Sequence, residues 1–168
     1  SISPHLRRHP LTGDWVGIAA ARQGRTFLPN QAECPLCAMH EGGPLTDIPV
    51  DAYEVAIFTN RFAALSAVPD IPPELGVATT PGHGICEVIS YSDTHDASLA
   101  TVGVERISLL IEAIGAEAAD LLKIDGIQYV LPFENRGREI GVTIDHPHSQ
   151  IYALSHIPVR IERQAEAF

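Results

Sequence analysis

The sequence predicts an α+β fold in which a mainly antiparallel sheet packs against one long amphipathic helix. Short runs rich in branched residues recur at irregular intervals, and one long segment has helical periodicity. With 168 residues and 45% apolar side chains, the chain can form one domain, residues 1–168, with a sizeable buried core. Its 13 Gly and 13 Pro residues keep most elements short.

The expected strands are short and bounded by turn residues. They cover residues 15–18, 53–58, 84–89, 127–133 and 151–154. Residues 22–50 contain four Pro residues and a Gly-Gly pair, which predicts an irregular loop.

Residues 98–122 are expected to form the helix. Their apolar positions fall near helical spacing: Leu99, Val102, Ile107, Leu110, Ile111, Ile114, Ala118, Leu121 and Leu122. Gly103 and Gly115 each weaken a helix by about 1 kcal/mol relative to Ala. We therefore expect close packing against the sheet at both glycines.

The charge balance excludes some classes of function. Eleven basic and 21 acidic residues give a formal charge of −10, which argues against nucleic-acid binding, although a few Arg residues can still hold a small anion. No apolar run reaches the roughly 18 residues of a membrane span, and the first residues lack the apolar core of a signal peptide. We expect a cytoplasmic protein whose three Cys residues serve as thiols or metal ligands.

The first chemical motif is Cys-Pro-Leu-Cys at residues 34–37. Two thiolates at this spacing can bind one zinc ion. The alternatives are a redox pair, which usually precedes a helix, and two buried thiols. Zinc needs two further ligands, and the His residues considered are His40, His83, His95, His146 and His148. Cys86 lies within an expected strand and is interpreted as a core residue.

The second motif is His-Pro-His-Ser-Gln at residues 146–150. In an extended chain His146, His148 and Gln150 share one face, where three polar side chains make poor core material. Both His residues could bind metal, or one could attack phosphorus, because imidazole is neutral near pH 7 and a good nucleophile. The Gln150 amide can donate a hydrogen bond to a phosphoryl oxygen.

These residues, preceded by Phe-Glu-Asn-Arg-Gly at 133–137, resemble the signature of the galactose-1-phosphate uridylyltransferases of the histidine-triad superfamily. Further segments resemble the family in the same order: the opening strand at 8–16, the zinc loop at 34–37, the nucleotide-facing segment at 58–65, and Ser-Asp-Thr-His at 92–95. The resemblance implies a histidine-triad-like half-barrel.

The resemblance also implies roles for particular residues. Structural zinc would be held by Cys34, Cys37, His95 and His146. His148 would be the nucleophile that becomes uridylylated, and Gln150 would hold the α-phosphoryl oxygens. The expected substrate contacts are Arg22, Arg25, Leu36, Asn60, Asn135, Thr143 and Gln150. The implied enzyme is a nucleotidyltransferase of galactose metabolism that exchanges UMP between UDP-glucose and galactose 1-phosphate.

Two other functions stay open. One is a phosphorylase that acts on an ADP-sugar or a dinucleotide through the same His intermediate, and the other is a zinc-stabilised nucleotide-binding half-domain without turnover. Ser149 stands where the family usually has Gly, and Asp145 stands where Pro is common. Family members also carry a homologous second half that nothing here resembles. We therefore expect a homodimer, or pairing with a chain that supplies that half.

Overall fold

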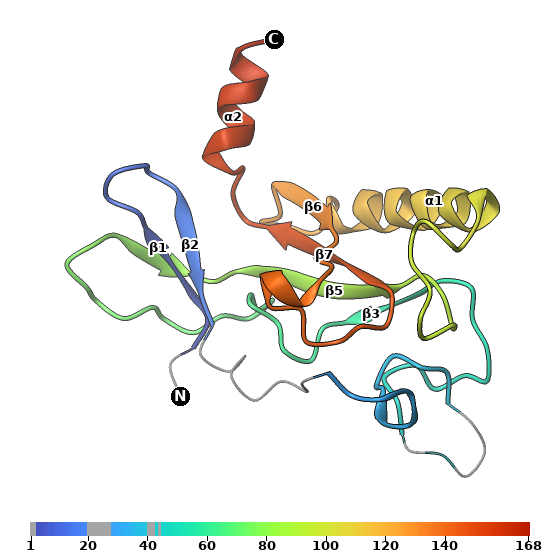
Figure 1. Cartoon of the computed structure of the whole chain (residues 1–168). Coiled ribbons are helices and arrows are strands. Elements are labelled where there is room, and N and C mark those ends of the chain that lie inside the picture. Colours follow the sequence, from blue (N-terminus) through green and yellow to red (C-terminus); the bar gives the residue numbers. More distant parts are fainter. Residues whose placement is uncertain (1–2, 20–27, 40–42, 44) are drawn as a thin grey trace.

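The computed structural model describes residues 3–19, 28–39, 43 and 45–168. Figure 1 shows its strands, which are β1 (His5–Arg8), β2 (Trp15–Ile18), β3 (Ala56–Thr59), β4 (Thr79–Pro81), β5 (Gly84–Ser90), β6 (Tyr129–Phe133) and β7 (His148–Leu154). The helices are α1 (Val104–Leu121) and α2 (Val159–Glu166), with 3-10 turns η2 (Gln31–Glu33) and η3 (Arg138–Ile140).

Two antiparallel sheets organise these elements. The larger sheet has four strands in the order β3-β5-β7-β6, and the smaller has three in the order β2-β1-β4. In the larger sheet β5 and β7 pair along their whole length, from Gly84 opposite Leu154 to Ser90 opposite His148. The predicted α+β fold with a mainly antiparallel sheet is confirmed.

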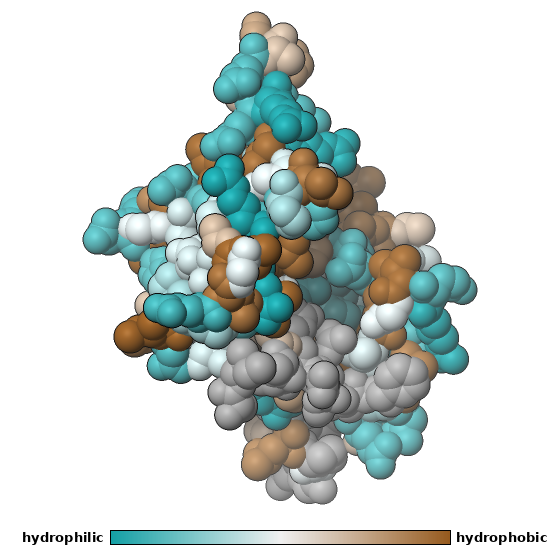
Figure 2. Space-filling model, turned by 90° about the vertical axis from the view of Figure 1, so that its left-hand side faces the viewer, coloured by the Kyte–Doolittle hydropathy of each residue, from teal (hydrophilic) through white to brown (hydrophobic). Residues whose placement is uncertain are grey.

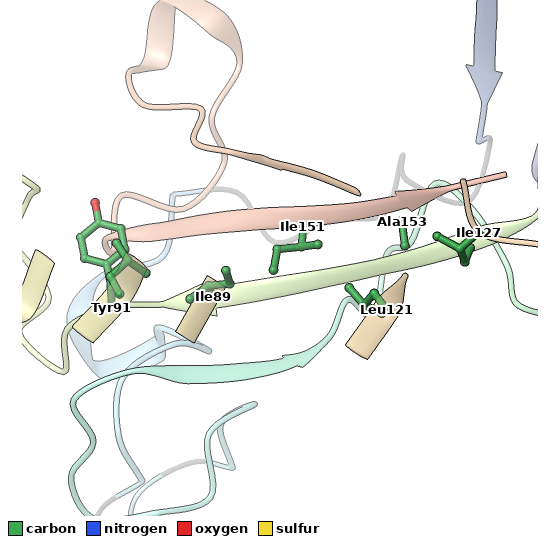
Figure 3. Close-up of a cluster of buried hydrophobic side chains, with 7 residues drawn as sticks. Ile89, Tyr91, Leu121, Ile127, Ile151 and Ala153 are labelled. Atoms are coloured by element: carbon green, nitrogen blue, oxygen red, sulfur yellow. The ribbon is translucent and has the colours of Figure 1, made fainter. Parts of the chain in front are cut away.

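Helix α1 covers one face of the four-stranded sheet (Figure 1). The core between them contains Leu110 and Leu121 from the helix, with Ile89, Ile151 and Ala153 from the two central strands. Figure 3 shows these strand side chains along β5 and β7, with Tyr91 at one end and Ile127 at the other. Because strand side chains alternate between faces, His148 and Gln150 lie on the opposite face of β7.

That opposite face carries two smaller clusters. Cys86 packs with Leu6 and Leu65, which confirms its interpretation as a core residue. Cys34, Leu36 and Cys37 form the other cluster, against which Phe58, Val88 and Ile144 pack. The sheet therefore separates a structural core under α1 from a face that carries the Cys and His motifs.

The helix differs from the prediction at its start and at its glycines. It begins at Val104 rather than at Ser98, and Gly103 is its N-cap with a φ of 85°, a conformation that favours glycine. Gly115 is exposed, and a Cβ there would meet nothing within 4 Å. The expectation of close packing at these two glycines was wrong. Ile111 is 64% exposed and does not face the sheet.

Three elements were absent from the predictions. Strands β1 and β4 pair with each other in the small sheet. Helix α2 buries none of its residues and projects from the rest of the chain in Figure 1 and Figure 2.

Within the part of the chain that the structure describes, no helix is both long and apolar enough to cross a membrane.

Candidate functional site

Four buried side chains from distant parts of the sequence meet on the face of the sheet opposite α1. The ligand atoms that Cys34, Cys37, His95 and His146 offer all lie within 4.8 Å of one another. The two Cys residues come from the loop after η2. His95 follows β5, and His146 precedes β7. This is the Cys₂His₂ set that the family resemblance implied.

The distances suit a tetrahedral metal ion. Cys37 Sγ lies 3.4 Å from His95 Nδ1 and 3.5 Å from His146 Nδ1. A tetrahedral zinc ion, with Zn–S of about 2.3 Å and Zn–N of about 2.0–2.1 Å, places its S and N ligands roughly 3.5 Å apart. The residues present therefore fit the ion.

Burial keeps two of the clustered ligand groups neutral. Burial, and then the neighbouring Cys34, raises the pKa of Cys37 to about 12. Burial lowers the pKa of His146 to about 4, so that its imidazole is neutral. The neutral His146 ring is ready to bind a metal, whereas the Cys37 thiol would have to release its proton as the metal binds.

His148 is held by the residue two positions before it. Its Nδ1 lies 2.7 Å from the carbonyl oxygen of His146, so the Nδ1–H donates there and the lone pair of a neutral ring is left on Nε2. Burial lowers the pKa of His148. The ring is therefore oriented and unprotonated at Nε2, as a nucleophile requires.

Gln150 follows on the same face of β7 and is oriented by Asn60. Asn60 Nδ2 lies 3.5 Å from Gln150 Oε1 and donates to it, which leaves the Gln150 NH₂ group for another partner. The Asn60 Oδ1 accepts from the backbone N–H of Phe62 at 2.9 Å. Asn60 is thus both a turn residue and a positioning group.

Two cavities meet at His148. The first has a mainly apolar wall that includes Leu36, Phe58 and Val88. The second is strongly polar and is lined by Glu134, Asn135, Arg136, Arg138, Glu139 and Asp145, among others. His148 lines both cavities.

The other predicted substrate contacts divide between these cavities. Leu36, Asn60, Thr143 and Gln150 line the first, whereas Asn135 lines the second. Arg22 and Arg25 lie outside the residues that the structure describes.

Sequence reasoning missed several residues around the site. The Tyr53 hydroxyl lies within hydrogen-bond distance of His146, and Tyr91 donates to Glu134 Oε1 at 2.8 Å at the edge of the polar cavity. Arg138 donates to Asp145 at 3.0 Å. Asp145, the acid that stands before His146, therefore links the η3 turn to the end of the loop that precedes β7.

Comparisons with known proteins agree with the site. The model of the family described as "Galactose-1-phosphate uridyl transferase, N-terminal domain" matches residues 1–158. The chain is 37% identical over 162 residues to a galactose-1-phosphate uridylyltransferase of Thermotoga maritima, covering 94% of this chain and 48% of that protein. It is 26% identical over 183 residues to an ADP-glucose phosphorylase of Arabidopsis thaliana, covering 98% of this chain and 52% of that protein.

A solved structure of a uridylyltransferase has the same fold. It superposes with a TM-score of 0.78 at 27% identity, over 97% of this chain and 50% of the other. The chain thus spans about half the length of the relatives it matches. It belongs to the galactose-1-phosphate uridylyltransferase family and matches that family's N-terminal domain.

Proposed function

We propose that the chain is the catalytic N-terminal half of a uridylyltransferase, which moves UMP between UDP-glucose and galactose 1-phosphate through a uridylyl-His148 intermediate. The observation that carries this proposal is the position of His148 between an apolar and a polar cavity. A flat base suits the first cavity. The sugar phosphate would lie in the second cavity, where Arg136 and Arg138 would be its anion-binding groups. Four carboxylates line the same cavity, those of Asp96, Glu134, Glu139 and Asp145, and Arg138 is paired with Asp145.

The first half-reaction begins at His148 Nε2. Its lone pair attacks the α-phosphorus, an N–P bond forms, and the P–O bond to glucose 1-phosphate breaks as that product leaves with the electron pair. Gln150 and Thr143 would donate hydrogen bonds to the α-phosphoryl oxygens as their charge grows. The second half-reaction reverses these bond changes with galactose 1-phosphate as the acceptor, so His148 is regenerated.

In this proposal Arg22 and Arg25 bind the phosphates, Leu36 packs on the base, and Asn60 and Asn135 line the nucleotide site. Zinc would be held by Cys34, Cys37, His95 and His146. When bound, it would fix the geometry of the ligand loop and of His146 without polarising the substrate. Because the His146 carbonyl accepts from His148, a fixed His146 also keeps the nucleophile in place.

The assembly is part of the same proposal. The relatives are about twice as long as this chain, and β3 and β6 are the outer strands of the larger sheet. An outer strand offers unpaired backbone groups to another chain. We expect a homodimer or a complex with a C-terminal-half chain.

A cytoplasmic location fits three cysteines that form no disulfide within the described residues.

The test is the release of glucose 1-phosphate when the chain is mixed with UDP-glucose alone. The proposal predicts up to one equivalent per chain, followed by UDP-galactose when galactose 1-phosphate is added. A preference for ADP-glucose would favour the phosphorylase function, which the Arabidopsis relative also suggests. Tight binding of UDP-glucose with no release would favour the half-domain without turnover.

A further inference from the structure

We infer that Tyr53 is a positioning residue that ties the metal ligands to the substrate-binding face of the sheet. This inference rests on the metal site of the proposed function. Tyr53 lies just before β3, outside the Cys and His motifs, and no role was expected for it. Its side chain reaches the Cys₂His₂ cluster from beside the sheet, and burial raises the pKa of its hydroxyl well above the ordinary value.

Four polar atoms surround the Tyr53 hydroxyl. They are the Leu36 carbonyl oxygen at 2.7 Å, the Ser92 carbonyl oxygen at 2.7 Å, the Ser90 Oγ at 2.8 Å and the His146 Nε2 at 2.9 Å. Leu36 lies between the two Cys ligands, Ser90 pairs with His148 in the sheet, and His146 is itself a ligand. One hydroxyl therefore contacts the metal loop, β5 and a ligand ring.

The proton inventory fixes how these contacts are shared. If His146 Nδ1 faces the metal, the ring proton is on Nε2, which lies 2.8 Å from the Ser92 carbonyl oxygen and donates to it, with Tyr53 Oη as a second acceptor. Either hydroxyl of the Ser90–Tyr53 pair can donate to the other, and we take Ser90 as the donor. The single proton of Tyr53 is then available for the Leu36 carbonyl, to which no other described group donates in the structure.

This arrangement has two consequences for the site. Partners of the second nitrogen of a ligand His fix its tautomer and orientation, and their loss typically weakens metal binding roughly 10–100-fold. Leu36 also lines the apolar cavity beside His148. Holding the Leu36 carbonyl thus couples the metal loop to the wall of the proposed base site.

The test compares Tyr53→Phe with Tyr91→Phe. Tyr91 is the control because it is also a tyrosine whose hydroxyl makes a hydrogen bond inside the protein. It is fully buried, and its hydroxyl donates to Glu134 at 2.8 Å rather than to the metal cluster. Each variant of the full chain is titrated with zinc against a chelator of known affinity. If a metal-free variant is unfolded, the zinc concentration that restores its far-UV circular dichroism gives the same comparison.

We expect Tyr53→Phe to bind zinc roughly 10–100-fold more weakly than the unmodified chain, and Tyr91→Phe to keep at least most of that affinity. Equal affinity in the two variants would overturn the role of Tyr53 while the metal site stands. An unmodified chain that binds no zinc would instead overturn the metal site, and the inference with it.

Discussion

Replacing Glu87 with Gln should stabilise the chain at pH 8 and have little effect at pH 5. Glu87 lies on β5 opposite Ile151, and it shares the α1-facing side of the strand with Ile85 and Ile89. Its Oε2 atom is buried without a hydrogen-bond partner. A carboxylate in this position loses hydration that the apolar face under α1 does not replace.

The direction of this pH effect on stability follows from the pKa of Glu87. Burial, and then the neighbouring Glu117 of α1, raises the pKa of Glu87 from 4.5 to about 7. The folded chain therefore holds this proton between about pH 4.5 and pH 7, whereas the unfolded chain releases it. Stability from this group is fully present below pH 4.5 and is lost as the pH rises through 7.

The magnitude follows from the same values. The difference between about 7 and 4.5 is about 2.5 pH units, which at 1.36 kcal/mol per unit has an upper limit of about 3 kcal/mol. Glu87 is only half-buried, and solvent screening reduces the expected effect to about 1 kcal/mol. The amide introduced by Glu87→Gln has no proton to lose, so this variant should not show the pH-dependent loss.

The assay is urea unfolding followed by circular dichroism at pH 5 and pH 8. Glu117→Gln should give a smaller gain at pH 8, because it removes only the second cause of the raised pKa. Glu112→Gln, at an exposed position of the same helix, is the control and should change neither value. A Glu87→Gln effect that is the same at both pH values would refute the reasoning.

Four further predictions concern the site and the assembly. Cys34→Ser should remove the bound metal and lower the melting temperature, whereas Cys86→Ala, in a separate cluster, should keep the metal; full metal content in Cys34→Ser by elemental analysis would contradict this. Gln150→Ala should slow glucose 1-phosphate release by up to roughly 10²–10³-fold. Asn60→Ala should slow it about fivefold with zinc content unchanged, because a positioning hydrogen bond contributes about 1 kcal/mol. An unaltered rate would exclude the orienting role. Light scattering should detect self-association at high concentration, and a strictly monomeric chain without a partner would count against the proposed pairing.

The sequence was most informative where chemistry depends on residues close together in the chain. Cys34 and Cys37 are joined by one turn, and His148 and Gln150 share a face because strand side chains alternate. These local relationships, with the family resemblance, were enough to predict the four residues that the structure brings together as a possible metal site. The central strands and the long helix were found for the same reason, although β7 begins at His148 rather than at Ile151 and the helix at Val104 rather than at Ser98.

What the sequence could not indicate depends on contacts between distant segments. Tyr53 looks like an ordinary strand residue, and its contact with His146 spans 93 positions. The apolar residues around Glu87 are enough to predict a strand, but they do not show which face of the sheet Glu87 occupies. The register of β5 with β7 places Glu87 on the face under α1. Strands β1 and β4 are short and lack a strong alternating pattern, so only their pairing identifies them: β1 pairs with both β2 and β4.

The most direct test of the central claim is a search for UMP bound to His148. The chain is incubated with UDP-glucose, its intact mass is measured, and the modified peptide is identified before and after mild acid, which cleaves a phosphoramidate. The account predicts one acid-labile uridylyl group on His148, and its absence in His148→Ala, which should retain zinc because His148 is not among the four clustered ligands. An adduct that persists in His148→Ala, or that maps to another residue of the unmodified chain, would contradict it.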